Sequence, residues 1–199
     1  LAGLPRTPAS GLIWAQLIPG ANGRIGAMHV RIAVPPSTRE FGQRLFDNKT
    51  AWAAREAVAG ERDPIAVEGA MPHYGIPHVA VDHVSTDVGH ATARMRGNAH
   101  SYTAFFIESF IDETASMFWR EPLSYRIEML GHDVRRAACL QRAAQLAEWD
   151  GGRDQSGQGL ACHRIGSMEN GGRIACIATA RRDEGGLKVT KLSAAVDIG

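Results

Sequence analysis

A helical middle between two strand-forming blocks limits the folds open to this 199-residue chain. Over 103–118, apolar side chains recur with the 3.6-residue period of a helix that buries one face. The predicted buried face holds Phe106, Ile107, Phe110, Ile111 and Phe118, and the predicted polar face holds Glu108, Asp112 and Glu113. Pro122 and Asp133 stand where helices typically begin, which predicts helices over 123–130 and 134–149.

Strand-like segments lie on both sides of the helical block. Before it, the pattern predicts a hairpin with a glycine-containing turn, then a short helix and a half-buried strand; 37–48 shows no clear period. These segments are 12–19, 25–34, 50–58 and 78–84. After it, strands are predicted over 159–165, 173–180 and 187–198. The predicted fold class is therefore α+β, with strands and helices mixed, a helical middle and β-rich ends.

Composition removes several classes of function. Lys and Arg total 22 against 21 for Asp and Glu, so charge gives no case for a nucleic-acid or membrane-surface partner. No apolar run approaches the roughly 20 residues of a membrane helix. Three cysteines, an odd number, argue against a disulfide scaffold. The cysteines and the eight histidines also lack the paired spacing of a protein-ligated metal site.

The loop that leads into the helix at 103–118 is the strongest candidate binding site. Arg94, Arg96 and Gly97 precede the helix start, whose unpaired N–H groups carry partial positive charge and suit an anion. Glycine lets the backbone approach a ligand closely. From spacing alone, an ordinary loop-to-helix junction capped by Ser101 fits equally well.

The same loop carries a family resemblance. Arg96-Gly97, His100-Ser101 and the run 104–113 resemble the molybdenum-binding large subunits of the xanthine oxidase and aldehyde oxidoreductase family, above all the isoquinoline 1-oxidoreductase beta branch. Supporting matches lie at 66–69, 121–126, 157–161 and 194–199. The resemblance covers roughly residues 60–199 well and the first 60 loosely.

The resemblance implies an oxidoreductase that hydroxylates aldehydes or N-heteroaromatic compounds with oxygen from water. Its expected cofactor is molybdopterin cytosine dinucleotide, which holds molybdenum without protein ligands to the metal. Its expected partners are a small subunit with two 2Fe-2S clusters and the remainder of the large subunit. The residues 1–149 would form an α/β portion with the Arg-Gly loop, and 150–199 a β-rich segment of the same domain. Either the bacterial cytoplasm or the periplasm fits.

Four residues are carried over as cofactor-binding: Arg96, Gly97, Asn98 and Ala99. Arg96 is expected to make a polar contact with the cofactor or an active-site oxygen, while Asn98 and Ala99 depart from the family's usual pair. No catalytic residue is predicted, because the general-base glutamate is expected beyond Gly199. The isolated chain is therefore expected to be inactive. The alternative is a non-catalytic α/β module that binds an anionic ligand or docks a partner at the Arg96 loop.

Overall fold

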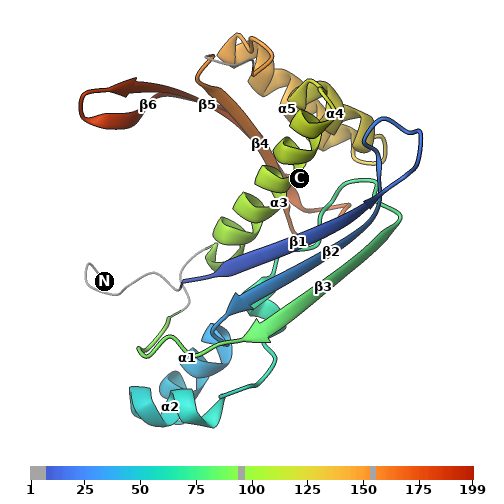
Figure 1. Cartoon of the computed structure of the whole chain (residues 1–199). Helices are drawn as coiled ribbons and strands as arrows, with labels where there is room; N and C mark the ends of the chain where they lie inside the picture. The colour runs from blue at the N-terminus through green and yellow to red at the C-terminus, as the bar shows by residue number, and fades with distance from the viewer. Residues whose placement is uncertain (1–7, 94–96, 153–155) are drawn as a thin grey trace. The chain divides into compact units, whose positions relative to one another are not determined.

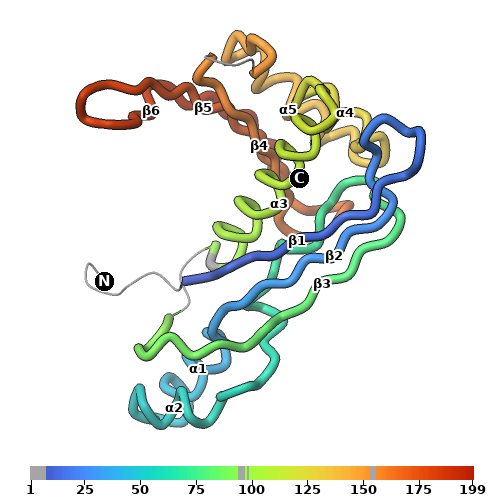
Figure 2. The backbone as a smooth tube through the Cα atoms, viewed as in Figure 1, coloured from blue at the N-terminus to red at the C-terminus, as the bar shows by residue number. Residues whose placement is uncertain are grey.

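The computed structural model describes residues 8–93, 97–152 and 156–199, which divide into two compact units. The first unit comprises the segments up to 16, 26–72 and 78–107. The second comprises 17–25, 73–77 and 108–199. Figure 1 labels the elements of both units, and Figure 2 follows the backbone through them. The mixture of helices with two three-stranded sheets confirms the predicted α+β class.

A three-stranded sheet forms the centre of the first unit (Figure 1). Its order is β1 (Ser10–Leu17), β2 (Ile25–Val34) and β3 (His78–Ser85). β2 and β3 run parallel, and the residues between them include the helices α1 (Ser37–Leu45) and α2 (Ala51–Ala57) and the 3-10 turn η1 (Pro64–Val67). Because side chains alternate along a strand, one face of β2 forms the core. Its buried residues are Met28, Val30, Ile32 and Val34, each 3% exposed or less.

Helix α1 lies where the sequence shows no clear period. Its N-cap residue, Pro36, provides no side-chain cap. Instead the Asp63 carboxylate accepts hydrogen bonds from the amides of Thr38 and Arg39, at 2.8 and 3.2 Å. These bonds satisfy N–H groups that a helix start leaves without partners. The capping group comes from a distant part of the chain, which explains why local sequence signals do not predict this helix.

The second unit combines helices with an antiparallel sheet of order β4-β5-β6. Helix α3 (Asn98–Met117) crosses from the first unit into the second and is followed by α4 (Pro122–Met129) and α5 (Val134–Ala147). The strands are β4 (Gln158–Ile165), β5 (Gly172–Asp183) and β6 (Gly186–Asp197). Leu160, Cys162, Ala175 and Ile177 form the buried face of the sheet. No helix among the described residues is long and apolar enough to span a membrane.

Two predicted helix starts are confirmed. Pro122 is the first residue of α4, and the Glu121 carboxylate caps the helix by accepting from the amides of Leu123 and Ser124, at 2.9 and 2.7 Å. Asp133 caps α5 by accepting from the amide of Arg136 at 3.2 Å.

One prediction about helix α3 is wrong. Glu108, expected on the polar face, is only 5% exposed. It is buried because a buried arginine of α4, Arg126, donates from Nε to its carboxylate at 3.0 Å. An ion pair within the second unit therefore overrides the helical pattern at this position.

Candidate functional site

The N-terminus of α3 carries the predicted cofactor loop. Arg96 lies outside the described residues. Gly97 lies inside them, directly before the helix start at Asn98. Gly97 has φ +75°, a left-handed conformation that L side chains rarely adopt. A Cβ atom at Gly97 would meet no atom of the described residues within 4 Å. Backbone conformation, and not packing against the described residues, therefore requires glycine here.

Buried contacts with the segment 66–69 hold the first turn of α3 in place. Ala99 is completely buried, and its carbonyl accepts a hydrogen bond from Oγ1 of Thr103 at 2.8 Å. Thr103 is itself buried, and its hydroxyl also lies 3.0 Å from the carbonyl oxygen of Glu68. The hydroxyl of Tyr102 donates to the carbonyl of Ala66. The first turn is thus held against the segment 66–69.

Gly69 lets the two segments approach closely. Its φ is +83°, and a Cβ atom there would lie 2.4 Å from Nδ1 of His100. The His100 ring also faces Glu68, with Nε2 3.7 Å from the carboxylate. Unlike Gly97, Gly69 is required both by its backbone conformation and by lack of space. The structure therefore brings together two motifs, 66–69 and 97–101, that the sequence marks separately.

The residues before the loop are anchored on α1. The amide of Thr92 donates to the buried Glu40 carboxylate at 3.0 Å, and Arg44 donates to the Thr92 carbonyl. Further back, Arg55 of α2 donates to both carboxylate oxygens of Asp87 at 2.7 Å. The chain enters the loop from a fixed position on the helices of the first unit.

The electrostatics of the helix start favour a negatively polarised ligand. α3 is 20 residues long and has no acidic residue in its first turn. Its first N–H groups therefore keep the partial positive charge of a helix N-terminus. This partial charge at a helix start attracts an oxygen of a phosphate, a carboxylate or a polarised ring substituent. No group of His, Cys, Asp and Glu in the described part of the chain is arranged to hold a metal ion.

A buried polar network in the second unit is a feature that the sequence does not mark. Glu108 accepts from the hydroxyl of Tyr74 at 2.8 Å and from the amide of Cys162 at 3.0 Å, in addition to Arg126. Burial, with the nearby Glu108 charge, raises the pKa of the Cys162 thiol to about 12. A thiol with that pKa is a poor nucleophile, so Cys162 is not a candidate for nucleophilic catalysis. Only burial reveals the network, because its members are far apart in sequence.

Comparison with known proteins gives one relative and two similar structures of note. No protein-family model matches the chain. The chain is 25% identical, over 141 residues, to isoquinoline 1-oxidoreductase subunit beta of Brevundimonas diminuta, a match that covers 70% of this chain and 18% of the relative.

The fold is similar to those of the aldehyde oxidoreductases of Desulfovibrio desulfuricans ATCC 27774 and Desulfovibrio gigas, with TM-scores of 0.54 and 0.50. Each is 18% identical, and each match covers 92% of this chain and 21% of the solved chain. The chain thus spans about a fifth of the length of these relatives. Sequence similarity to one member and the shared fold confirm the predicted resemblance to the molybdenum-binding subunits of the xanthine oxidase and aldehyde oxidoreductase family.

Proposed function

We propose that this chain forms part of the molybdopterin-binding large subunit of a molybdenum hydroxylase, similar to isoquinoline 1-oxidoreductase. The reaction is hydroxylation of an aldehyde or an N-heteroaromatic compound, with water as the oxygen donor and two electrons passed on. The observation that carries the proposal is the start of α3. There a glycine with a left-handed backbone, which has no described atom within 4 Å of the place of a Cβ, stands before the first turn of a long helix that carries no acidic residue in that turn.

The proposed cofactor, molybdopterin cytosine dinucleotide, fits a site that offers backbone donors and close approach. When bound, it supplies the molybdenum redox chemistry of the reaction. Gly97 would let the cofactor approach the backbone, and the first-turn amides at Asn98 and Ala99 would donate hydrogen bonds to its oxygen atoms. Arg96 is proposed to add a polar contact, although it lies outside the described residues. Thr103 and Glu68 keep the first turn in place through the bonds described above.

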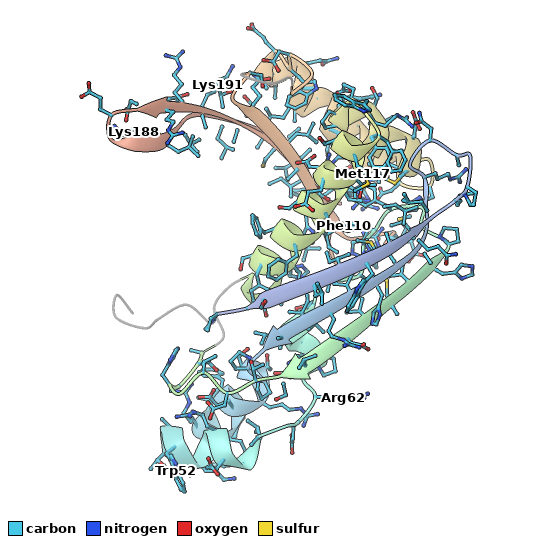
Figure 3. All side chains as sticks on the ribbon, viewed as in Figure 1. Trp52, Arg62, Phe110, Met117, Lys188 and Lys191 are labelled. Carbon is cyan, nitrogen blue, oxygen red and sulfur yellow. The ribbon has the colours of Figure 1, made fainter. Side chains whose placement is uncertain are left out.

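The proposed partners are the remainder of the large subunit and a small subunit with two 2Fe-2S clusters. Support comes from β6, whose apolar side chains are exposed although they belong to a sheet. Leu187, Val189, Leu192 and Val196 are each 59–77% exposed. Figure 3 labels Lys188 and Lys191 on the same strand. An exposed apolar strand of this kind marks an interaction surface. Binding of a hydrophobic dye to the isolated chain, and self-association at modest concentration, are expected and are cheap to measure.

The isolated chain is proposed to be inactive, because the general base would lie outside it. The test is to reconstitute the chain with the cofactor, measure bound molybdenum, and assay turnover of isoquinoline and of an aldehyde. We expect no turnover. Stoichiometric molybdenum together with turnover would contradict the proposal that the chain is only part of the catalytic subunit.

A chimera tests the cofactor site directly. This chain replaces the matching segment in the Brevundimonas diminuta subunit, and molybdenum content is measured with Gly97→Ala and with Gly60→Ala as the matched control. Gly60 also has a positive φ, +77°, and open space at its Cβ, but it lies after α2. We expect a similar loss of thermal stability in both variants and loss of molybdenum only in Gly97→Ala. Full molybdenum content in Gly97→Ala would refute the assignment.

A second candidate function rests on the same helix start. Because α3 has no acidic residue in its first turn, a non-catalytic module that binds an anionic ligand there is also consistent with the geometry. This reading predicts that the isolated chain binds inorganic phosphate and that Arg96→Ala abolishes the binding. If the isolated chain binds no phosphate and the chimera contains molybdenum, the results favour the hydroxylase proposal instead.

A further inference from the structure

Three arginines from three elements of the second unit surround one carboxylate. Arg136 lies on α5, Arg164 on β4 and Arg173 on β5. The carboxylate belongs to Asp133, which accepts from Nε of Arg173 at 3.2 Å and from Nη1 of Arg164 at 3.4 Å. Nε of Arg136 lies 3.9 Å from the same carboxylate. All four residues expose 9% or less of their surface, so the charges are shielded from water.

The charges of this cluster do not balance. Three guanidinium groups face one carboxylate, and among the described residues none of the three forms an ion pair with a second one. The carboxylate of Asp197, which stands opposite Arg173 on β6, is bound by Arg135 and so leaves the excess positive charge in place. His73 lies beside the cluster, with Nδ1 2.9 Å from Nη2 of Arg164. Burial, followed by the charge of Arg164, lowers the pKa of His73 to about 3, so the ring adds no charge at neutral pH. A buried excess of positive charge is unfavourable unless an anion offsets it.

Backbone carbonyls accept hydrogen bonds from only some of the N–H donors of the three guanidinium groups. Arg136 donates to the carbonyl of His73, and Arg173 donates to those of Met168 and Gly171. The Nε atoms of Arg136 and Arg164 are buried and find no hydrogen-bond partner among the residues that the structure describes. Two charged N–H donors therefore remain unused in the same cluster, which is the condition for binding an acceptor.

The surroundings of the cluster raise its positive potential and cover it. Asp133 caps α5, so the positive end of a 14-residue helix points toward the cluster. The turn between β4 and β5 covers it, because Arg164 donates to the sulfur of Met168 at 2.8 Å. Met168 is 37% exposed, which places the cluster close to solvent.

We propose that the cluster of Asp133, Arg136, Arg164 and Arg173 binds one small inorganic anion of halide size through its unused Nε donors. Two donors suit a monatomic anion, whereas a phosphate presents more oxygen acceptors than these donors can satisfy. The bound anion offsets part of the excess charge and stabilises the packing of α5 on the sheet. The site is separate from the α3 loop and does not depend on the cofactor.

The test is thermal unfolding of the full chain in rising sodium chloride, with ionic strength held constant by sodium gluconate. Anion binding to the folded state alone raises Tm along a saturating curve, by about 5–10 °C at one hundred times Kd. Arg164→Gln removes one unused donor and one excess charge. Arg142→Gln, at an exposed position of α5, makes the same charge change away from the cluster.

The proposal requires a saturating chloride response in the wild type and in Arg142→Gln, and its loss in Arg164→Gln. A purely structural Arg164 predicts that the variant's Tm differs from the wild type by the same amount in both salts, which would overturn the proposal. An equal response to inorganic phosphate would overturn the assignment to a small anion. If Arg164→Gln does not fold, the chloride titration of the wild type tests the proposal by itself, because a wild-type Tm that does not depend on chloride refutes the site. Arg164→Lys should then retain a weaker chloride response.

Discussion

Glu108→Gln should destabilise the second unit by about 3 kcal/mol, because it leaves a buried guanidinium without its main counter-charge. Arg126 is fully buried, and its Nε lies 3.0 Å from Glu108. Its other carboxylate partner, Asp112, is 44% exposed and so offsets less of the charge. Gln has the shape of Glu and can still accept hydrogen bonds, so the predicted loss comes mainly from the charge.

The assay is urea unfolding followed by circular dichroism. With a typical m-value of about 2 kcal/mol/M, a loss of 3 kcal/mol lowers the midpoint by about 1.5 M. Glu113→Gln is the matched control, because Glu113 is exposed on the same helix and its substitution should change stability by less than about 0.5 kcal/mol. Equal midpoints for the two variants would refute the argument that the pair with Arg126 controls this packing.

Three further predictions test other buried features. The pKa of His73, lowered to about 3 from 6.5, means that the unfolded chain takes up this proton first, so stability is lost as pH falls from about 6.5 toward 3, by at most about 1.4 kcal/mol per pH unit. Urea midpoints at pH 7 and 5 check this, and His73→Asn should show a smaller difference between them. Gly69→Ala should lower Tm well beyond Gly60→Ala, because only its Cβ meets a neighbour, at 2.4 Å, while both positions have positive φ. A brief iodoacetamide treatment of the folded chain should modify the half-buried Cys176 before Cys162, as mass spectrometry of the peptides would show; labelling of Cys162 first would contradict its burial.

Local rules predict part of this fold well. The starts of α4 and α5 follow from Pro122 and Asp133, because proline suits the first helical position and aspartate caps its own helix. The strands after the helical middle follow from alternating apolar residues and glycine turns. In each case the signal and the structure that it specifies lie within a few residues of each other.

The features that the sequence does not predict share one physical cause, which is an interaction with a residue far away in sequence. Helix α1 escapes prediction because its cap, Asp63, comes 25 residues after Thr38. Glu108 is assigned to the wrong face because its partner Arg126 lies 18 residues further along. Spacing and period cannot report such partners, because they come together only when the chain folds.

The candidate site divides in the same way. The sequence alone determined the α+β class, the long helix, the glycine at its start and the resemblance to molybdenum hydroxylases. Only the tertiary structure decided that the segment 66–69 supports the first turn of that helix, and that three arginines share one buried aspartate. The reason is that propensity and capping act between near neighbours in the chain. Burial and charge balance depend on which distant side chains share the same space.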